Sequence, residues 1–135
     1  MGGTLYSRYG NLTIDNSAIV NNYIYQIGGA GVFNRGGTTI IRETTISGNS
    51  TGSSTSHGAG IQQTIGGSLT VSDSTIANNH SYYSGGGLMA HAGTITFNNS
   101  TISGNRARGA SNSGGGIRNE GATITQEVKV SLCKL

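Results

Sequence analysis

The chain lacks the residues that most globular domains use to build a large core. Its 135 residues include no tryptophan and no proline, and only 33% of them are hydrophobic. A globular domain of this length would need a larger apolar fraction, whereas a solenoid needs less because its core is a thin apolar column. The length fits one domain, and the composition favours an elongated stack of units.

Charge and cysteine are also scarce. Eight basic and five acidic residues give a net charge of +3, which is too weak and too scattered to indicate nucleic-acid binding. The single cysteine, Cys133, excludes an intrachain disulfide. No apolar run is long enough to span a bilayer, so we expect no membrane insertion. Met1 leads directly into a glycine pair in mid-repeat, without a signal-peptide pattern or a capping unit, and we expect either a piece of a longer array or an unusually truncated member.

What the sequence has in abundance is glycine, arranged in an internal repeat. The clearest copy is GGGLMAHAGTITFNNSTISGNRARGASNS at residues 85–113. The apolar residue after each glycine cluster recurs at steps of 27, 29, 27 and 29 residues, at Leu5, Val32, Ile61, Leu88 and Ile117. Two further apolar columns follow, at Ile14, Ile41, Val71 and Phe97 and at Ile19, Ile46, Ile76 and Ile102. Such a period is the signature of a repeat architecture.

The apolar columns stand in short runs that alternate apolar and polar residues, which is the period of a β-strand. Each copy therefore predicts about three short strands, and stacking the copies about 4.8 Å apart pairs equivalent strands in parallel. We predict an all-β fold, a right-handed parallel β-helix of about five coils over residues 1–125. Residues 126–135 break the register, because Gln126 replaces an apolar residue. Alternation through Leu132 predicts one longer straight strand there, either a terminal edge strand or sequence from outside the array.

An asparagine follows each isoleucine of the third column at a distance of three residues, at Asn22, Asn49, Asn79 and Asn105. The residue before each of them is asparagine or glycine, which tolerate positive φ and so predict a corner. An inward amide could bond to the same residue in the coils above and below, forming an asparagine ladder. The alternative is that these are ordinary loop asparagines.

At GGGL, GGGI and TITFNNSTISGN the chain resembles the right-handed β-helix repeats of bacterial surface and secreted proteins. It is similar to the polymorphic outer-membrane-protein repeats of autotransporter passengers. The signatures of those repeats are Gly-Gly-Ala-Ile and Phe-x-x-Asn. Here Gly28-Gly29-Ala30 is followed by Gly31 rather than isoleucine, and Phe97-Asn98-Asn99 is followed by Ser100 rather than asparagine. The resemblance implies an extracellular or cell-surface segment with a structural or adhesive role and no catalytic motif.

Catalytic and metal sites receive little support from the spacing. Asp15 and Asp73 are expected in neighbouring columns two coils apart, about 9–10 Å, a separation compatible with an inverting glycosidase pair. Both fit equally as corner-forming residues. His57, His80 and His91 fall in three different columns without metal-ligand spacing and are expected to be exposed loop histidines. We therefore predict no enzyme, no metal and no cofactor, with a β-helix polysaccharide lyase or hydrolase fragment as the alternative.

Two surface features suggest binding. The loops after the asparagines carry aromatic and cationic side chains that stacking would align as a platform for a glycan or a protein surface: Tyr23, Tyr25, Tyr82, Tyr83, Arg106 and Arg108. These tyrosines could instead cover an exposed end of the apolar column, and an uncapped end could support end-to-end self-association. The second feature is a Thr-x-Thr face, complete at 94–96 and 123–125, which resembles the ice-binding face of β-solenoid antifreeze proteins.

Overall fold

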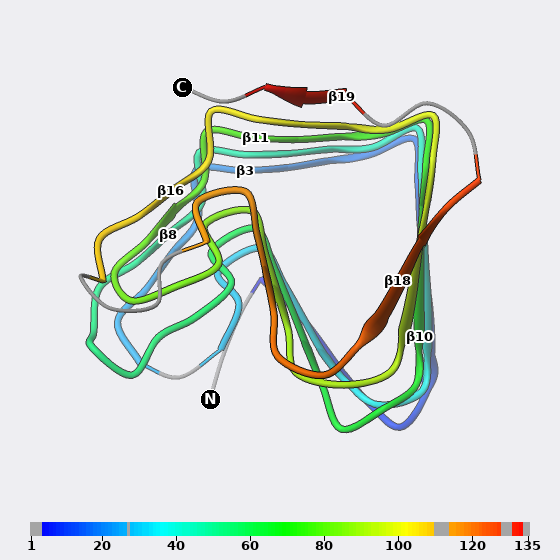
Figure 1. The fold of residues 1–135 in the computed structure, drawn as a ribbon, viewed down its shortest axis with the longest axis horizontal. Coiled ribbons are helices and arrows are strands. Elements are labelled where there is room, and N and C mark those ends of the chain that lie inside the picture. The colour runs from blue at the N-terminus through cyan, green and yellow to red at the C-terminus, as the bar shows by residue number, and fades with distance from the viewer. Residues whose placement is uncertain (1–3, 27, 110–113, 128–130, 134–135) are drawn as a thin grey trace.

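The computed structural model describes residues 4–26, 28–109 and 114–127 and the backbone of 131–133. These residues form strands and turns without any helix, arranged as four parallel sheets that run along one stack (Figure 1). The predicted all-β parallel solenoid is confirmed. None of the described residues forms a helix that could cross a membrane.

Each coil visits the sheets in the same order, which we name A, B, C and D. Sheet A contains β1 (Leu5–Arg8), β5 (Val32–Arg35), β9 (Ile61–Thr64), β13 (Leu88–Ala90) and β17 (Ile117–Asn119). Sheet B contains β2 (Asn11–Asp15), β6 (Thr38–Arg42), β10 (Ser68–Ser72), β14 (Thr94–Asn98) and β18 (Thr123–Gln126). Sheet C contains β3 (Ala18–Val20), β7 (Thr45–Ser47), β11 (Thr75–Ala77), β15 (Thr101–Ser103) and β19 (Ser131–Cys133).

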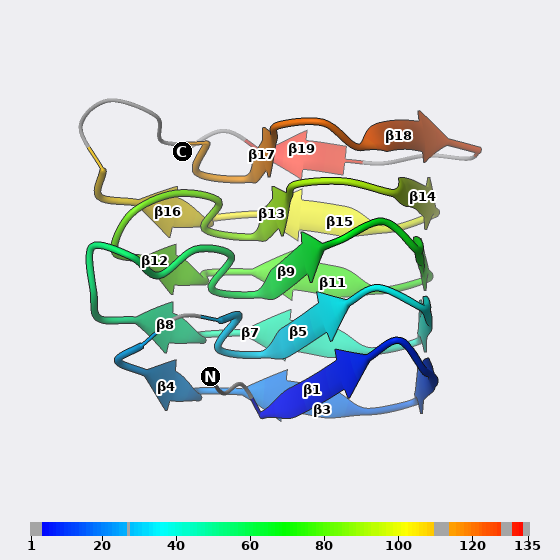
Figure 2. The ribbon, with the colours of Figure 1, turned by 90° about the horizontal axis from the view of Figure 1, so that it is seen from below.

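Sheet D is the element that the repeat pattern did not predict. It contains β4 (Tyr23–Ile24), β8 (Ser50–Thr51), β12 (His80–Ser81) and β16 (Arg106–Ala107), so each full coil has four strands rather than about three. Figure 2 shows these four strands as a separate column beside sheets A and C. Each strand is two residues long, which is too short to leave a recognisable alternation in the sequence.

The three predicted apolar columns line the interior of the stack. The register pairs Leu5 with Val32 in sheet A, Ile14 with Ile41 in sheet B and Ile19 with Ile46 in sheet C. A further inward column in sheet B joins them, made of Leu12, Thr39, Leu69, Ile95 and Ile124. The apolar side chains of these columns form one continuous core along the stack, and Thr39 is a buried polar residue within it. In the last coil, Gln126 takes the place opposite Phe97 and is exposed.

The four asparagines form a hydrogen-bonded ladder at the end of sheet C. Asn22, Asn49 and Asn79 each donate from Nδ2 to Oδ1 of the asparagine in the next coil, at 2.9, 3.0 and 2.9 Å. Their backbone N–H groups donate to the same oxygens at 2.9–3.0 Å. Asn49 and Asn79 are fully buried, and the residues before the four asparagines all have positive φ.

A second ladder, made of hydroxyl groups, lies at the start of sheet C. The backbone N–H of Ser17 donates to Thr44 Oγ1, that of Thr44 to Ser74 Oγ and that of Ser74 to Ser100 Oγ, at 3.1–3.3 Å. Each hydroxyl also donates to the carbonyl two residues before it, at 2.6–2.8 Å. Both corners of sheet C are therefore held by side chains that bridge successive coils.

The glycine clusters are explained by the close approach of neighbouring coils. A Cβ at Gly60 would lie 2.5 Å from the carbonyl oxygen of Gly87 and 3.0 Å from Nδ2 of Asn79. Gly31 meets the equivalent atoms one coil earlier, Gly60 O and Asn49 Nδ2. The repeat needs glycine at this column because the backbone passes directly beside the asparagine ladder.

The tail does not form the single straight strand that the alternation predicted. β18 pairs with β14 in sheet B, whereas β19 pairs with β15 in sheet C, so the chain passes from one sheet to the next. Residues 128–130 lie outside the described residues, and the division at residue 126 stays a prediction. β19 is an edge strand of sheet C.

Candidate binding face on sheet D

The outward side chains of sheet D gather most of the predicted binding residues. The register aligns Tyr23 with Ser50, Ser50 with His80, and His80 with Arg106. One residue further on, Ser81 and Ala107 pair and point inward. The residues after them, Tyr82 and Arg108, are exposed again. We call this surface the sheet D face, and its members are Tyr23, Tyr25, Ser50, Gly52, His80, Tyr82, Arg106 and Arg108.

Successive side chains of an extended segment point to opposite sides, so every second residue of the sheet D segments points away from the core. Tyr23, Tyr25 and Tyr82 are exposed, and Ile24 and Ser81 between them are less so. Tyr23 and Tyr25 keep 65% of their surface accessible and Tyr82 keeps 42%. The ring of Tyr23 occupies the space that a side chain at Gly52 would take in the next coil. Gly52 therefore leaves room for the Tyr23 side chain of the preceding coil.

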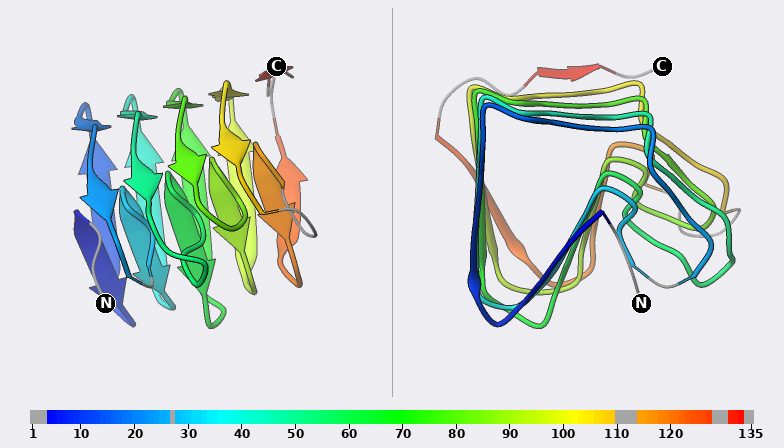
Figure 3. Two further views of the ribbon diagram at one scale, coloured as in Figure 1. Left: turned by 90° about the vertical axis from the view of Figure 1, so that its left-hand side faces the viewer. Right: turned by 180° about the vertical axis from the view of Figure 1, so that it is seen from behind.

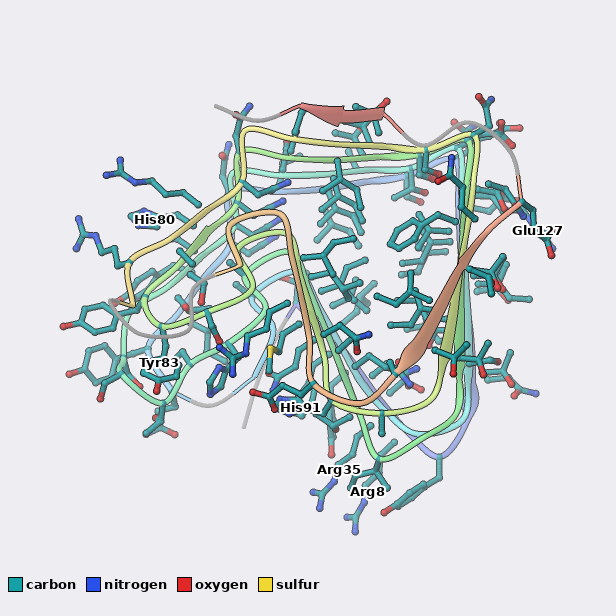
Figure 4. The ribbon with its side chains drawn as sticks, viewed as in Figure 1. Arg8, Arg35, His80, Tyr83, His91 and Glu127 are labelled. Carbon is teal, nitrogen blue, oxygen red and sulfur yellow. The ribbon has the colours of Figure 1, made fainter. Side chains whose placement is uncertain are left out.

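The cationic part of the face lies in the fourth coil. Arg106 and Arg108 are both exposed and stand beside His80 and Tyr82 of the preceding coil. Burial lowers the pKa of His80 below its ordinary value, and the charges of Arg108 and Arg106 lower that pKa further. His80 is thus held neutral near pH 7, and it projects from the outer side of the stack (Figure 4).

Tyr83 does not belong to this face. Its half-buried ring packs edge-on against His57, with ring centroids 5.0 Å apart. The structure therefore brings Tyr23, Tyr25, Tyr82, Arg106 and Arg108 together and directs Tyr83 elsewhere.

His57 belongs to a polar cluster that the sequence did not predict. The segments after sheet D turn back toward sheet A (Figure 3), and His57 on one of them meets His91 beside β13, with ring centroids 5.8 Å apart. His57 Nδ1 lies 2.7 Å from Ser84 Oγ, and His91 Nδ1 lies 2.8 Å from Glu120 Oε2. We call this set the histidine seam: His57, Ser84, His91, Arg118 and Glu120.

Burial and neighbouring charges shift the pKa values of His57 and Glu120 in the histidine seam. Burial lowers the pKa of His57, and His91 lowers it further. Burial alone would raise the pKa of Glu120, but the hydrogen bond from Arg118 and the proximity of His91 hold the pKa of that carboxyl below its usual range. The expectation of exposed loop histidines was wrong, because all three histidines are partly buried. No group of three metal-ligating side chains occurs among the described residues.

The two aspartates considered for hydrolysis lie at the corner between sheets B and C. Asp15 ends β2, and Asp73 follows β10 with φ of 49°. Asp73 Oδ1 accepts a hydrogen bond from Asn99 Nδ2 at 2.7 Å. Asn16, Glu43 and Asn99 share this positive φ at the same corner. Asp73 therefore forms the corner, as the structural alternative for this residue predicted.

The outer face of sheet B carries threonine in regular register. One outward column of sheet B is made of Asp15, Arg42, Ser72 and Asn98. The two outward columns beside it are Asn11, Thr38, Ser68, Thr94 and Thr123, and Thr13, Ile40, Thr70, Thr96 and Thr125. None of the side chains in these two columns is charged, and Thr96 and Thr125 are within hydrogen-bond distance at 3.1 Å. We call this surface the threonine face.

Sheets, ladders and register together define a parallel β-solenoid with an apolar interior. Residues 1–132 match the family described as "Right handed beta helix region", and the chain belongs to that family. Searches of curated proteins and of solved structures returned no match. The family includes both enzymes and non-enzymes.

Proposed function

We propose that the protein is a non-catalytic β-helix scaffold of the cell-surface or secreted type, which binds a glycan or a protein surface through the sheet D face. The observation that carries the proposal is the alignment of three exposed tyrosines and two exposed arginines on one side of a stiff stack. Tyrosine and arginine are the side chains that most often anchor contacts. Tyrosine also offers a flat ring with a polar tip.

Binding to a glycan array and to cell surfaces tests this function. We expect Tyr82→Ser and Tyr25→Ser to reduce binding at least several-fold, because each removes an exposed ring from the face. Tyr9→Asn is the matched control, since Tyr9 is 59% exposed but lies at the corner after β1. Asparagine also suits the positive φ of that position. Equal binding by all four proteins would exclude the sheet D face as the contact surface.

Self-association is the other outcome of the same test. β1, β2 and β3 are edge strands of their sheets among the described residues, and an edge can pair with another chain. A concentration-dependent shift to dimers or filaments in light scattering, unaffected by Tyr82→Ser, would identify a second copy of the chain as the partner.

The threonine face supports a second candidate function, which is ice binding. Outward residues two apart lie about 6.6–7 Å apart and the coils repeat at about 4.8 Å. The two columns give a mesh of mostly hydroxyl and methyl groups, bordered by Asp15 and Arg42 in the third outward column. Thermal hysteresis that Thr96→Tyr abolishes would support this function, and its absence from the unmodified protein would reject it.

A polysaccharide lyase or hydrolase activity is the remaining alternative. Release of reducing ends or unsaturated product from uronate or neutral polysaccharides would reveal it. Loss of that activity in Asp15→Asn or Asp73→Asn would overturn the proposal of a non-catalytic scaffold.

A further inference from the structure

The acidic residues of the chain are all placed away from the sheet D face. Asp15, Glu43 and Asp73 lie at the corner between sheets B and C. Glu120 is held by Arg118 and His91 in the histidine seam, and Glu127 follows β18. With five acids in the whole sequence, the described part of the sheet D face contains cations and no anion. Its electrostatic potential is therefore positive at neutral pH.

The two arginines of the face are arranged to receive an anion. Arg106 lies in β16, Arg108 follows the end of that strand, and both side chains are exposed. Residues two apart in an extended backbone have Cα atoms about 6.6–7 Å apart. Within the described ranges, neither guanidinium group forms an ion pair or a side-chain hydrogen bond. Donors are therefore available for carboxylate or sulfate oxygens.

The shape of the face fits a linear chain. Its paired column runs from Tyr23 through Ser50 and His80 to Arg106, one residue per coil, which spans about 14 Å at the parallel strand spacing. The face is only two outward columns wide, or about 7 Å. A globular partner would need a broader patch, since even the smaller specific protein interfaces bury several hundred Å² on each side.

We propose that the sheet D face takes an anionic glycan that runs along the stack, with its sugar rings on Tyr25 and Tyr82 and its carboxylate or sulfate groups on Arg106 and Arg108. This inference rests on the proposed function and specifies the chemical class of its ligand. A guanidinium group binds such oxygens in a bidentate manner. Both arginines lie in the fourth coil, so the charged groups of the ligand are held at one end of the face.

Titration with three chains of matched length tests the proposal: heparin, desulfated heparin and neutral dextran. We expect the unmodified protein to bind at least one anionic chain, to bind dextran at least tenfold more weakly, and to lose affinity as salt rises. The variant Arg106→Ser/Arg108→Ser is expected to lose at least tenfold in affinity for the anionic chain. Binding to heparin but not to desulfated heparin identifies sulfate as the recognised group. Binding to both heparin and desulfated heparin identifies carboxylate.

The matched control is Arg8→Ser/Arg42→Ser, which removes the same net charge from exposed positions on sheets A and B. It is expected to bind like the unmodified protein. An equal loss in both double variants would show non-specific attraction and overturn the proposal. Equally tight binding to polyglutamate would overturn the glycan as the ligand. Equal binding of dextran that Tyr82→Ser abolishes would leave the proposed function standing and reject its anionic ligand.

Discussion

At the scale of single residues, asparagine and glycine are fixed by the contact between neighbouring coils. Asn79 donates to Asn105 and to the carbonyl of Ile46, and its Oδ1 accepts from both the backbone and the side chain of Asn49. Gly60 passes so close to this amide that no side chain fits. Two substitutions separate the hydrogen-bonding requirement from the steric one.

Asn79→Ala is expected to lower the free energy of unfolding by about 1–3 kcal/mol, because it leaves buried donors of Asn49 without an acceptor. Ile76→Ala in the same coil is expected to cost about 2–5 kcal/mol through lost burial and a cavity. Urea denaturation measures both. A neutral Asn79→Ala beside a destabilising Ile76→Ala would show that the ladder adds no stability.

Gly60→Ala is expected to destabilise the protein by about 1–3 kcal/mol or more, because the added methyl group meets backbone that cannot rotate away. Gly10→Ala is the control, since no heavy atom lies within 4 Å of a Cβ there. Thermal unfolding of both variants gives the comparison. Equal melting temperatures would mean that neighbouring coils separate enough to accept the methyl group.

At the scale of the elements, the histidine seam connects the segments that follow sheet D with the outer side of sheet A. His57 Nδ1 meets Ser84 Oγ, and the His57 ring touches Tyr83 and His91, which in turn is paired with Glu120 beside Arg118. Burial of a neutral imidazole makes this contact sensitive to acid.

His57→Asn is expected to reduce the loss of melting temperature between pH 7.5 and pH 5. The pKa of His57 is lowered in the folded protein, so its protonation favours the unfolded chain. The stability that depends on neutral His57 is complete above about pH 6.5, the pKa of an unperturbed histidine, and is lost as the pH falls below it. Asparagine keeps a polar group near Ser84 but does not titrate.

The pKa of Glu120 is below the usual carboxyl range, so its protonation changes the stability only at lower pH. A change in melting temperature between pH 7.5 and pH 5 therefore reports on the histidines. Gly10→Ala serves again as a control and should keep the pH dependence of the unmodified protein. If His57→Asn loses as much melting temperature as the unmodified protein on acidification, His57 does not cause the acid sensitivity.

At the scale of the whole molecule, each coil contacts its neighbours and the core is one column along the stack. This arrangement explains how a chain with few hydrophobic residues folds, since each coil needs only a few inward side chains. It also leaves the outer faces free to differ from one another, with tyrosine and arginine on sheet D and threonine on sheet B.

Far-ultraviolet circular dichroism is expected to show β-structure with almost no helix, because the described residues contain none. A helical content above about a fifth would contradict the fold, since parallel solenoids of this kind gain their order from strand stacking. Analytical ultracentrifugation on the same sample would report whether the frictional ratio fits an elongated stack.

The sequence by itself determined the coil. Leu5, Val32, Ile61, Leu88 and Ile117 recur at nearly constant intervals, and Asn22, Asn49, Asn79 and Asn105 keep a fixed offset from the third apolar column. Such features can be read along the chain because a solenoid repeats the same local contacts in every coil. The tyrosines and arginines of the loops differ from copy to copy, and their role as contact residues stays a prediction based on their place in loops on a rigid scaffold.

Only the tertiary structure decided which of these residues share a face. β12 ends at Ser81, and directly after it Tyr82 is exposed whereas Tyr83 packs against His57. No periodicity in the sequence reports a strand of two residues or the direction of the side chains that follow it. The segments after sheet D differ in length from coil to coil, and they turn back onto sheet A. His57 therefore meets His91, which is paired with Glu120, and the repeat period does not encode these contacts.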